Sequence, residues 1–233
     1  MTVSGQTIDY GPCAFMDHYN AKTVFSSIDK FGRYSYSNQP KITKWNLARF
    51  AECLIPLIDE DEDSSIKKAS EVIDNFEKIY EKKWLNMMRD KLGLFGEDKE
   101  DKKLINDLLN WMELNKIDYT NTFCYLMNVK TPEINCYKTN EFIHWINRWK
   151  KRLNLKENSS SKYLDLMRNS NPIVIPRNHK VEEALNAANE NNLELLENLL
   201  IVLEKPYNNQ DKIINFKSPA PLGNKEYQTF CGT

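Results

Sequence analysis

The chain has 233 residues, enough to bury a core as one large domain or as one domain with an appendage. Its 32 basic and 33 acidic residues leave a net charge of −1, so neither nucleic acid nor an anionic membrane is an expected partner. No apolar run reaches the ~18 residues of a membrane-spanning helix, and the N-terminus lacks the features of a secretory signal. Five widely spaced cysteines argue against a disulfide scaffold or a zinc site and predict a cytoplasmic, reduced protein.

A short β-like run opens the chain. Residues 3–8, with Ser4-Gly5 as a turn, predict an N-terminal β-hairpin that leads into Asp9 and a Tyr-Gly-Pro turn. A carboxylate at a strand end suits a divalent cation, and the segment is similar to the Asp-Phe-Gly segment of kinases, whose Asp binds Mg²⁺. The plainer interpretation is a turn aspartate that accepts backbone N–H bonds.

Glycine-rich phosphate loops are absent from the sequence. The seven glycines form neither Gly-x-Gly-x-x-Gly nor Gly-x-x-x-x-Gly-Lys, the patterns that bring backbone N–H groups close to phosphates. Any nucleotide chemistry therefore needs residues from outside this chain.

The rest of the chain has predominantly helical patterning. Residues 9–41 are an aromatic-rich loop, and a helix is predicted from Thr43 to about Leu57. From Ser65, one apolar stripe runs to Met87 and predicts a core-facing helical surface. Further helices are expected at about 99–115, 120–128, 139–154, 161–168, 179–190 and 192–204. Residues 206–233 lack a helical period and predict an extended tail.

Other candidate groups give weak chemical signals. Asp17 and His18 could form an acid/base pair, but adjacent residues of this kind more often fix a turn. His144 reads as a packed or half-exposed imidazole, and His179 follows an apolar run flanked by two prolines, which predicts a buried extended segment. Three scattered histidines do not predict a metal site.

A basic group lies on the helix that also carries Trp145 and Trp149; it comprises Arg148, Lys150, Lys151 and Arg152. A solvated helix face is the usual explanation, and the balanced total charge favours it over nucleic-acid binding.

A set of short segments occurs along the chain in a fixed order: 7–12, 15–17, 32–40, 45–47, 171–172, 177–178, the helical pair beyond them, and 206–207. In this order they resemble the C-terminal half of the selenoprotein O or YdiU family, pseudokinases that are protein adenylyltransferases. The resemblance covers essentially the whole chain. It implies a mainly α fold: the C-terminal lobe of a protein-kinase-like fold, with the N-terminal β-hairpin and an added helical region.

The resemblance also implies the chemistry. The family transfers AMP from ATP to Ser, Thr or Tyr hydroxyls of proteins, and Asp9 matches its metal-binding aspartate, which also contacts ATP. Family members carry a Cys or selenocysteine near the C-terminus, where Cys231 stands here; a redox link between Cys231 and Cys13 is a hypothesis. The family's catalytic loop, with its general base, would lie before Met1, so no catalytic base is expected in this chain.

These observations predict three segments and leave several functions open. Residues 1–62 are expected to form a kinase-like segment with the Asp-Tyr-Gly-Pro loop, 63–205 its helical continuation, and 206–233 the tail. The first interpretation is a truncated or split adenylyltransferase, inactive alone, that binds ATP and Mg²⁺ only when the missing lobe is supplied. Its partners would be a protein substrate or a separate N-terminal-half chain. The alternative is a non-catalytic helical interaction module, and an exposed lobe interface would also permit homo-oligomers.

Overall fold

The computed structural model describes residues 14–132, 135–153, 160–209 and 213–221. Within these ranges the chain is mainly helical and contains no β-strand, only an isolated antiparallel bridge between His18 and Asp118. The helices are η1 (Tyr36–Asn38), α1 (Gln39–Ile58), α2 (Glu62–Asp74), α3 (Phe76–Lys91), α4 (Asp101–Asn115), α5 (Tyr119–Leu126), η2 (Asn135–Lys138), α6 (Asn140–Leu153), α7 (Ser160–Ser170), α8 (Asn178–Asn189), α9 (Glu194–Leu203) and α10 (Ile214–Lys217).

The predicted mainly α fold class is confirmed. The predicted β-hairpin at residues 3–8 lies outside the described residues, and the kinase-like architecture stays a prediction. No helix of the described ranges combines the length and the apolar character needed to cross a bilayer.

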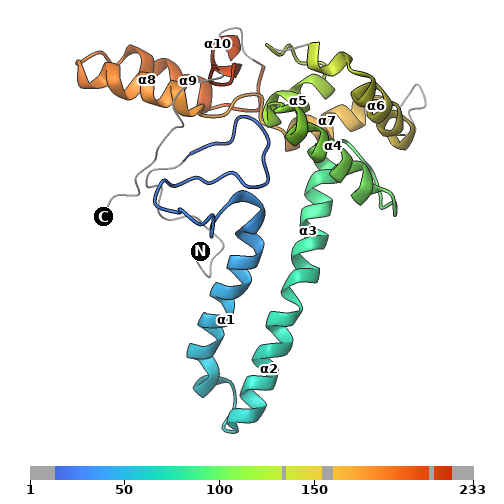
Figure 1. Ribbon diagram of the computed structural model, residues 1–233, viewed down its shortest axis with the longest axis vertical. Helices are drawn as coiled ribbons and strands as arrows, with labels where there is room; N and C mark the ends of the chain where they lie inside the picture. The colour runs from blue at the N-terminus through green and yellow to red at the C-terminus, as the bar shows by residue number, and fades with distance from the viewer. Residues whose placement is uncertain (1–13, 133–134, 154–159, 210–212, 222–233) are drawn as a thin grey trace.

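Helices α1, α2 and α3 form an arm that projects from the body of the molecule (Figure 1). Helix α1 runs away from the body and packs against α2, while α2 and α3 return in the opposite direction. Asp61 starts the return because its carboxylate accepts a hydrogen bond from the Ser64 N–H at 2.9 Å, which caps α2. The arm is therefore a helical hairpin with only two layers.

The sequence predicted one continuous core-facing helix here, and this expectation is wrong in two respects. Two helices meet at Asn75, which ends α2 and precedes α3. The apolar stripe is also largely uncovered: Ile66, Val72 and Ile79 are 43%, 71% and 51% exposed. Helical periodicity places apolar residues on one face, but it does not supply a partner for that face.

The core lies in the body, among α4, α5, α6 and the end of α3. Trp145 and Trp149 of α6 are buried, and their indole N–H groups donate to the carbonyls of Leu104 and Leu92 at 2.8 and 2.9 Å. Buried indoles need such partners, so these two bonds fix α6 against the end of α3 and against α4.

Of the four basic residues of α6, two form ion pairs with α4 and two are exposed to solvent. Arg152 donates to the buried Asp101 at 2.7 Å, and Arg148 donates to Asp107 at 2.6 Å, so both join α6 to α4. Lys150 and Lys151 are exposed. The two arginines thus join α6 to α4, and only the two lysines lie on the solvated helix face that the sequence predicts.

The C-terminal region contains an extended segment and a helical pair. Residues 171–177 are largely buried and run into α8, which confirms the buried extended segment predicted before His179. The Asn192 N–H donates to the Ala187 carbonyl at 2.9 Å and closes the short link between α8 and α9. The tail prediction missed the short helix α10, where the buried Lys217 ammonium donates to the Lys130 carbonyl at 2.6 Å.

Core and arm substitutions should differ sharply in their effect on stability. Leu108→Ala removes a fully buried side chain of α4 and should lower the free energy of unfolding by about 2–5 kcal/mol. Val72→Ala, on the exposed face of α2, should change it by less than about 0.5 kcal/mol. Urea unfolding of both variants checks this, and an equal loss for Val72→Ala would show that the arm face is covered in solution.

Candidate functional site

The residues singled out for chemistry by the resemblance are Asp9, Cys13 and Cys231, and all three lie outside the described residues. The structure therefore describes only residues that follow or precede them in the chain. Phe15 and Asp17 follow Asp9 closely in the chain, and both are fixed by contacts with distant segments.

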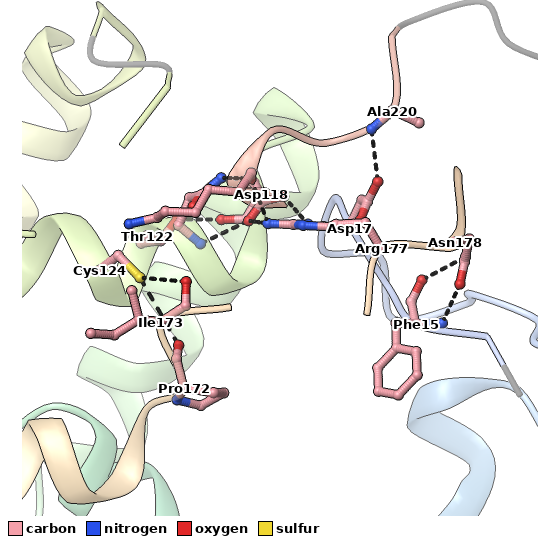
Figure 2. Close-up of polar contacts among 12 residues, drawn as sticks. Phe15, Asp17, Asp118, Thr122, Cys124, Pro172, Ile173, Arg177, Asn178 and Ala220 are labelled. Carbon is pink, nitrogen blue, oxygen red and sulfur yellow. Dashed lines mark hydrogen bonds and ion pairs between the residues drawn. The ribbon is translucent and has the colours of Figure 1, made fainter. Parts of the chain in front are cut away.

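An ion-pair cluster, here called the Arg177 junction, joins Arg177 to Asp17 and Asp118 (Figure 2). Arg177 is only 1% exposed, and its Nη1 lies 2.6 Å from Asp17 Oδ1 and 2.6 Å from Asp118 Oδ2. Its Nη2 donates to Asp118 Oδ1 at 3.1 Å and to the Lys217 carbonyl at 3.0 Å. The remaining Asp17 oxygen accepts the Ala220 N–H at 2.9 Å. Three stretches of chain therefore converge on the guanidinium of a fourth.

Burial and charge oppose each other at this junction. Burial raises the pKa of the Asp118 carboxyl, while Arg177 and the N–H of Asn121, at 2.7 Å, favour its charged form. Burial lowers the pKa of the Arg177 guanidinium, but the two carboxylates outweigh it and the pKa is raised overall. Asp118 also caps α5 through the Asn121 contact, so the same carboxylate orients a helix and neutralises a buried cation.

A second contact fixes the same loop. The Asn178 side chain accepts from the Phe15 N–H at 2.8 Å and donates to the Phe15 carbonyl at 2.9 Å (Figure 2). A side-chain amide that pairs with both backbone groups of one residue behaves like a strand partner. Together with the Arg177 junction, it ties residues 15–17 to the start of α8.

Next to this loop is a cavity of about 850 Å³, here called the Lys91 cavity. Its aromatic lining comprises Phe15, Phe25, Tyr34, Tyr36, Tyr119 and Phe123. Among the described residues that line it, the charged side chains are Asp29 and Lys91. The size and apolar lining match those of sites that bind small molecules or anchor side chains.

Lys91, the last residue of α3, is buried in an unusual setting. Its ammonium lies 4.4 Å from the centre of the Phe123 ring and 5.3 Å from that of Tyr119. The other charged lining residue does not reach it: both Asp29 oxygens accept backbone N–H groups, from Arg33 and Tyr34, each at 2.8 Å. Burial lowers the pKa of Lys91 to about 8, and the nearby Cys124 opposes the shift only in part.

The position of Lys91 is set by Asn171. The Asn171 amide nitrogen donates to the carbonyls of Lys91 and Met167, both at 2.8 Å, and so joins α3 to α7. Gly93 lies just beyond, where an added Cβ would come within 2.9 Å of the Tyr163 carbonyl. Only glycine permits this close approach of α7, and the Gly93 φ of 69° also favours it.

The predicted acid/base pair is not supported by the geometry. Asp17 is committed to Arg177 and Ala220, and His18 forms the backbone bridge with Asp118. His144 is exposed, and burial lowers the pKa of His179. Among the described residues, no group of three or more His, Cys, Asp or Glu side chains could hold a metal ion.

Two features of the site could not be predicted from the sequence. Arg177 belongs to one of the segments that resemble the family, but nothing in the sequence indicates its partners, which lie 59 and 160 residues away. Lys91 follows Arg89 and Asp90 on a charged helix and reads as a surface residue. Both roles depend on which distant segments pack against them.

Removing the guanidinium of the junction should be costly. Arg177→Met leaves Asp118 buried without its counter-ion, so we expect the free energy of unfolding to fall by about 3–5 kcal/mol. Arg168→Met, which breaks an exposed pair with Asp165, should cost less than about 1 kcal/mol. Thermal and urea unfolding measure both, and an equal effect of the two variants would contradict the role of the junction.

Lys91 should make stability depend on pH in the alkaline range. Its pKa is lowered to about 8 in the folded chain, so the unfolded chain binds more protons above that pH and the unfolding free energy should rise up to about pH 10.5. Lys91→Met should be more stable than the parent at pH 7, by about 1–3 kcal/mol, and the difference should shrink as the pH rises. A difference that does not change between pH 7 and pH 10 would show that the ammonium is not desolvated.

Comparison with known proteins places this chain in a family. Residues 1–204 match the family model described as protein adenylyltransferase SelO. The chain is 60% identical over 235 residues to the protein nucleotidyltransferase YdiU of Pelagibacter ubique, with 100% of this chain and 48% of the relative covered. The proteins of the same name from Nitrosococcus oceani and Alkaliphilus metalliredigens are 51% and 50% identical, with the same coverage. The chain spans about half the length of these curated relatives, and it belongs to the SelO family of protein adenylyltransferases.

Proposed function

We propose that this chain is the C-terminal part of a protein adenylyltransferase, which transfers AMP from ATP to protein hydroxyls. The observation that carries the proposal is the family match, which includes Asp9 and covers residues 1–204. The anchoring of Phe15 and Asp17 supports it, because it fixes the chain a few residues after Asp9 to a rigid body.

In this proposal, Asp9 is a ligand of Mg²⁺ on ATP. The metal, when bound, offsets the charge that develops on the phosphates during transfer. The role of this chain is to hold the Asp9 carboxylate in place, and the Arg177 junction restrains the loop that follows it. Positioning of this kind matters because phosphoryl-type transfer depends on fixed charges more than on covalent chemistry by the protein.

We propose further that the chain is inactive alone. It contains none of the glycine-rich patterns that cradle phosphates, and its described residues contain no metal-ligand cluster. The remaining ATP contacts and the general base would come from the other half of the family polypeptide.

A second candidate function is a helical interaction module. The exposed apolar side chains of the arm favour it, because contiguous apolar surface commonly marks a protein partner. In that case the chain would bind a partner protein without transferring AMP.

Reconstitution tests the proposal. The chain is mixed with the part of the Pelagibacter ubique relative that it does not match, together with ATP, Mg²⁺ and a protein substrate. We expect AMP transfer, followed as label from [α-³²P]ATP on protein, and a loss of about 100-fold or more with Asp9→Ala or after metal removal. Asp63→Ala, an exposed carboxylate on α2, should retain the activity. Transfer that is indifferent to Asp9 would refute its assigned role, and no transfer by the mixture would favour the module.

A further inference from the structure

The Lys91 cavity contains polar groups that this chain does not satisfy. Within the described part of the chain, the Lys91 ammonium pairs with no carboxylate; it lies against the Phe123 and Tyr119 rings, with the Cys124 thiol nearby. Two further lining residues have buried atoms without partners in the same part of the chain, namely Ser26 Oγ and Asn171 Oδ1. Buried polar atoms without partners are rare in folded proteins, and each costs about 1–3 kcal/mol.

The rim of the cavity also carries exposed apolar side chains, so the uncovered surface is larger than a small-molecule site. Ile28 and Tyr34 line the cavity and are exposed, and Phe31, between them in the chain, is 99% exposed. A small ligand would fill the cavity but would leave this rim in water. A polypeptide that enters the cavity and also covers the loop would bury both, so the surface favours a polypeptide occupant.

The family relationship indicates where such a polypeptide comes from. The chain matches only 48% of the Pelagibacter ubique relative, so the relative contains about as much additional chain. Residues 14–16 line the cavity and directly follow the segment that carries Asp9. In the proposed enzyme the other half must approach this segment to complete the ATP site, and this brings it to the mouth of the cavity.

We propose that the Lys91 cavity is the docking site for a segment of the other half of the family polypeptide, an apolar segment carrying an Asp or Glu whose carboxylate pairs with Lys91. This inference rests on the proposed function, because it takes the second half as the partner. The carboxylate supplies the missing counter-charge of the ammonium, and the apolar side chains beside it cover the aromatic lining. The low pKa of Lys91 in the isolated chain agrees with a cation whose counter-ion is absent.

The test measures binding without catalysis. The full chain is titrated by calorimetry with the unmatched part of the Pelagibacter ubique relative, in the absence of ATP. Lys91→Met keeps the length and apolar character of the side chain and removes the charge, and we expect it to weaken binding at least about tenfold. Lys83→Met, an exposed lysine on the same helix, removes the same charge and should bind within about twofold of the parent.

A second variant of this chain and a set of variants of the other half complete the test. Ile175→Trp fills the cavity from a partly buried lining position and should weaken binding even if Lys91→Met does not fold. Single Asp→Asn and Glu→Gln changes in the other half should reveal one carboxylate whose loss weakens binding to the parent but not to Lys91→Met. The absence of such a carboxylate would overturn the proposed ion pair.

The outcomes separate this inference from the proposed function. If the halves bind and transfer AMP while Lys91→Met binds like the parent, the docking site is wrong and the function stands. If binding depends on Lys91 but no AMP is transferred, the docking site stands and the function fails. If the halves do not bind at all, the inference is overturned.

Discussion

The buried guanidinium of Arg177 is the interaction on which the arrangement of the functional region depends. It meets Asp17 from the N-terminal loop, Asp118 from the start of α5 and the carbonyl of Lys217 from α10. A buried cation is tolerated only when acceptors surround it, so these segments cannot separate without exposing an uncompensated charge. The pairing therefore ties the loop that contains Asp17 to the start of α5 and to α10.

A different constraint acts on the Lys91 side of the same loop. The backbone of Lys91 is held by Asn171, but its ammonium is desolvated and faces aromatic rings. Arg177 and Lys91 thus represent two states of a buried cation, one neutralised within the chain and one without a counter-ion among the described residues. This difference distinguishes the Arg177 junction, whose charges are balanced within the chain and stabilise the fold, from the Lys91 cavity, which we propose binds a partner.

The arm, like the Lys91 cavity, has apolar surface that the described part of this chain does not cover. Its two-layer helical hairpin exposes apolar side chains such as Val72 that would normally face a core. In the family, about half of the polypeptide lies outside the matched region, so uncovered apolar surface is expected wherever that half packs. Within the body, α4, α5 and α6 bury an aromatic core of their own, in which the indole N–H groups of Trp145 and Trp149 donate to backbone carbonyls.

The sequence by itself determined the helical class, the family and the approximate bounds of most helices, because apolar periodicity and short motifs are local properties. It also indicated the buried extended segment before α8, since two prolines and an apolar run exclude a helix there. It did not indicate the break between α2 and α3 or the short helix α10. Only the tertiary structure decided that the stripe on α2 and α3 is exposed, that Arg177 pairs with Asp17 and Asp118, and that Lys91 is buried. The physical reason is that burial and ion pairing depend on which distant segments meet, whereas periodicity records only which residues share a face.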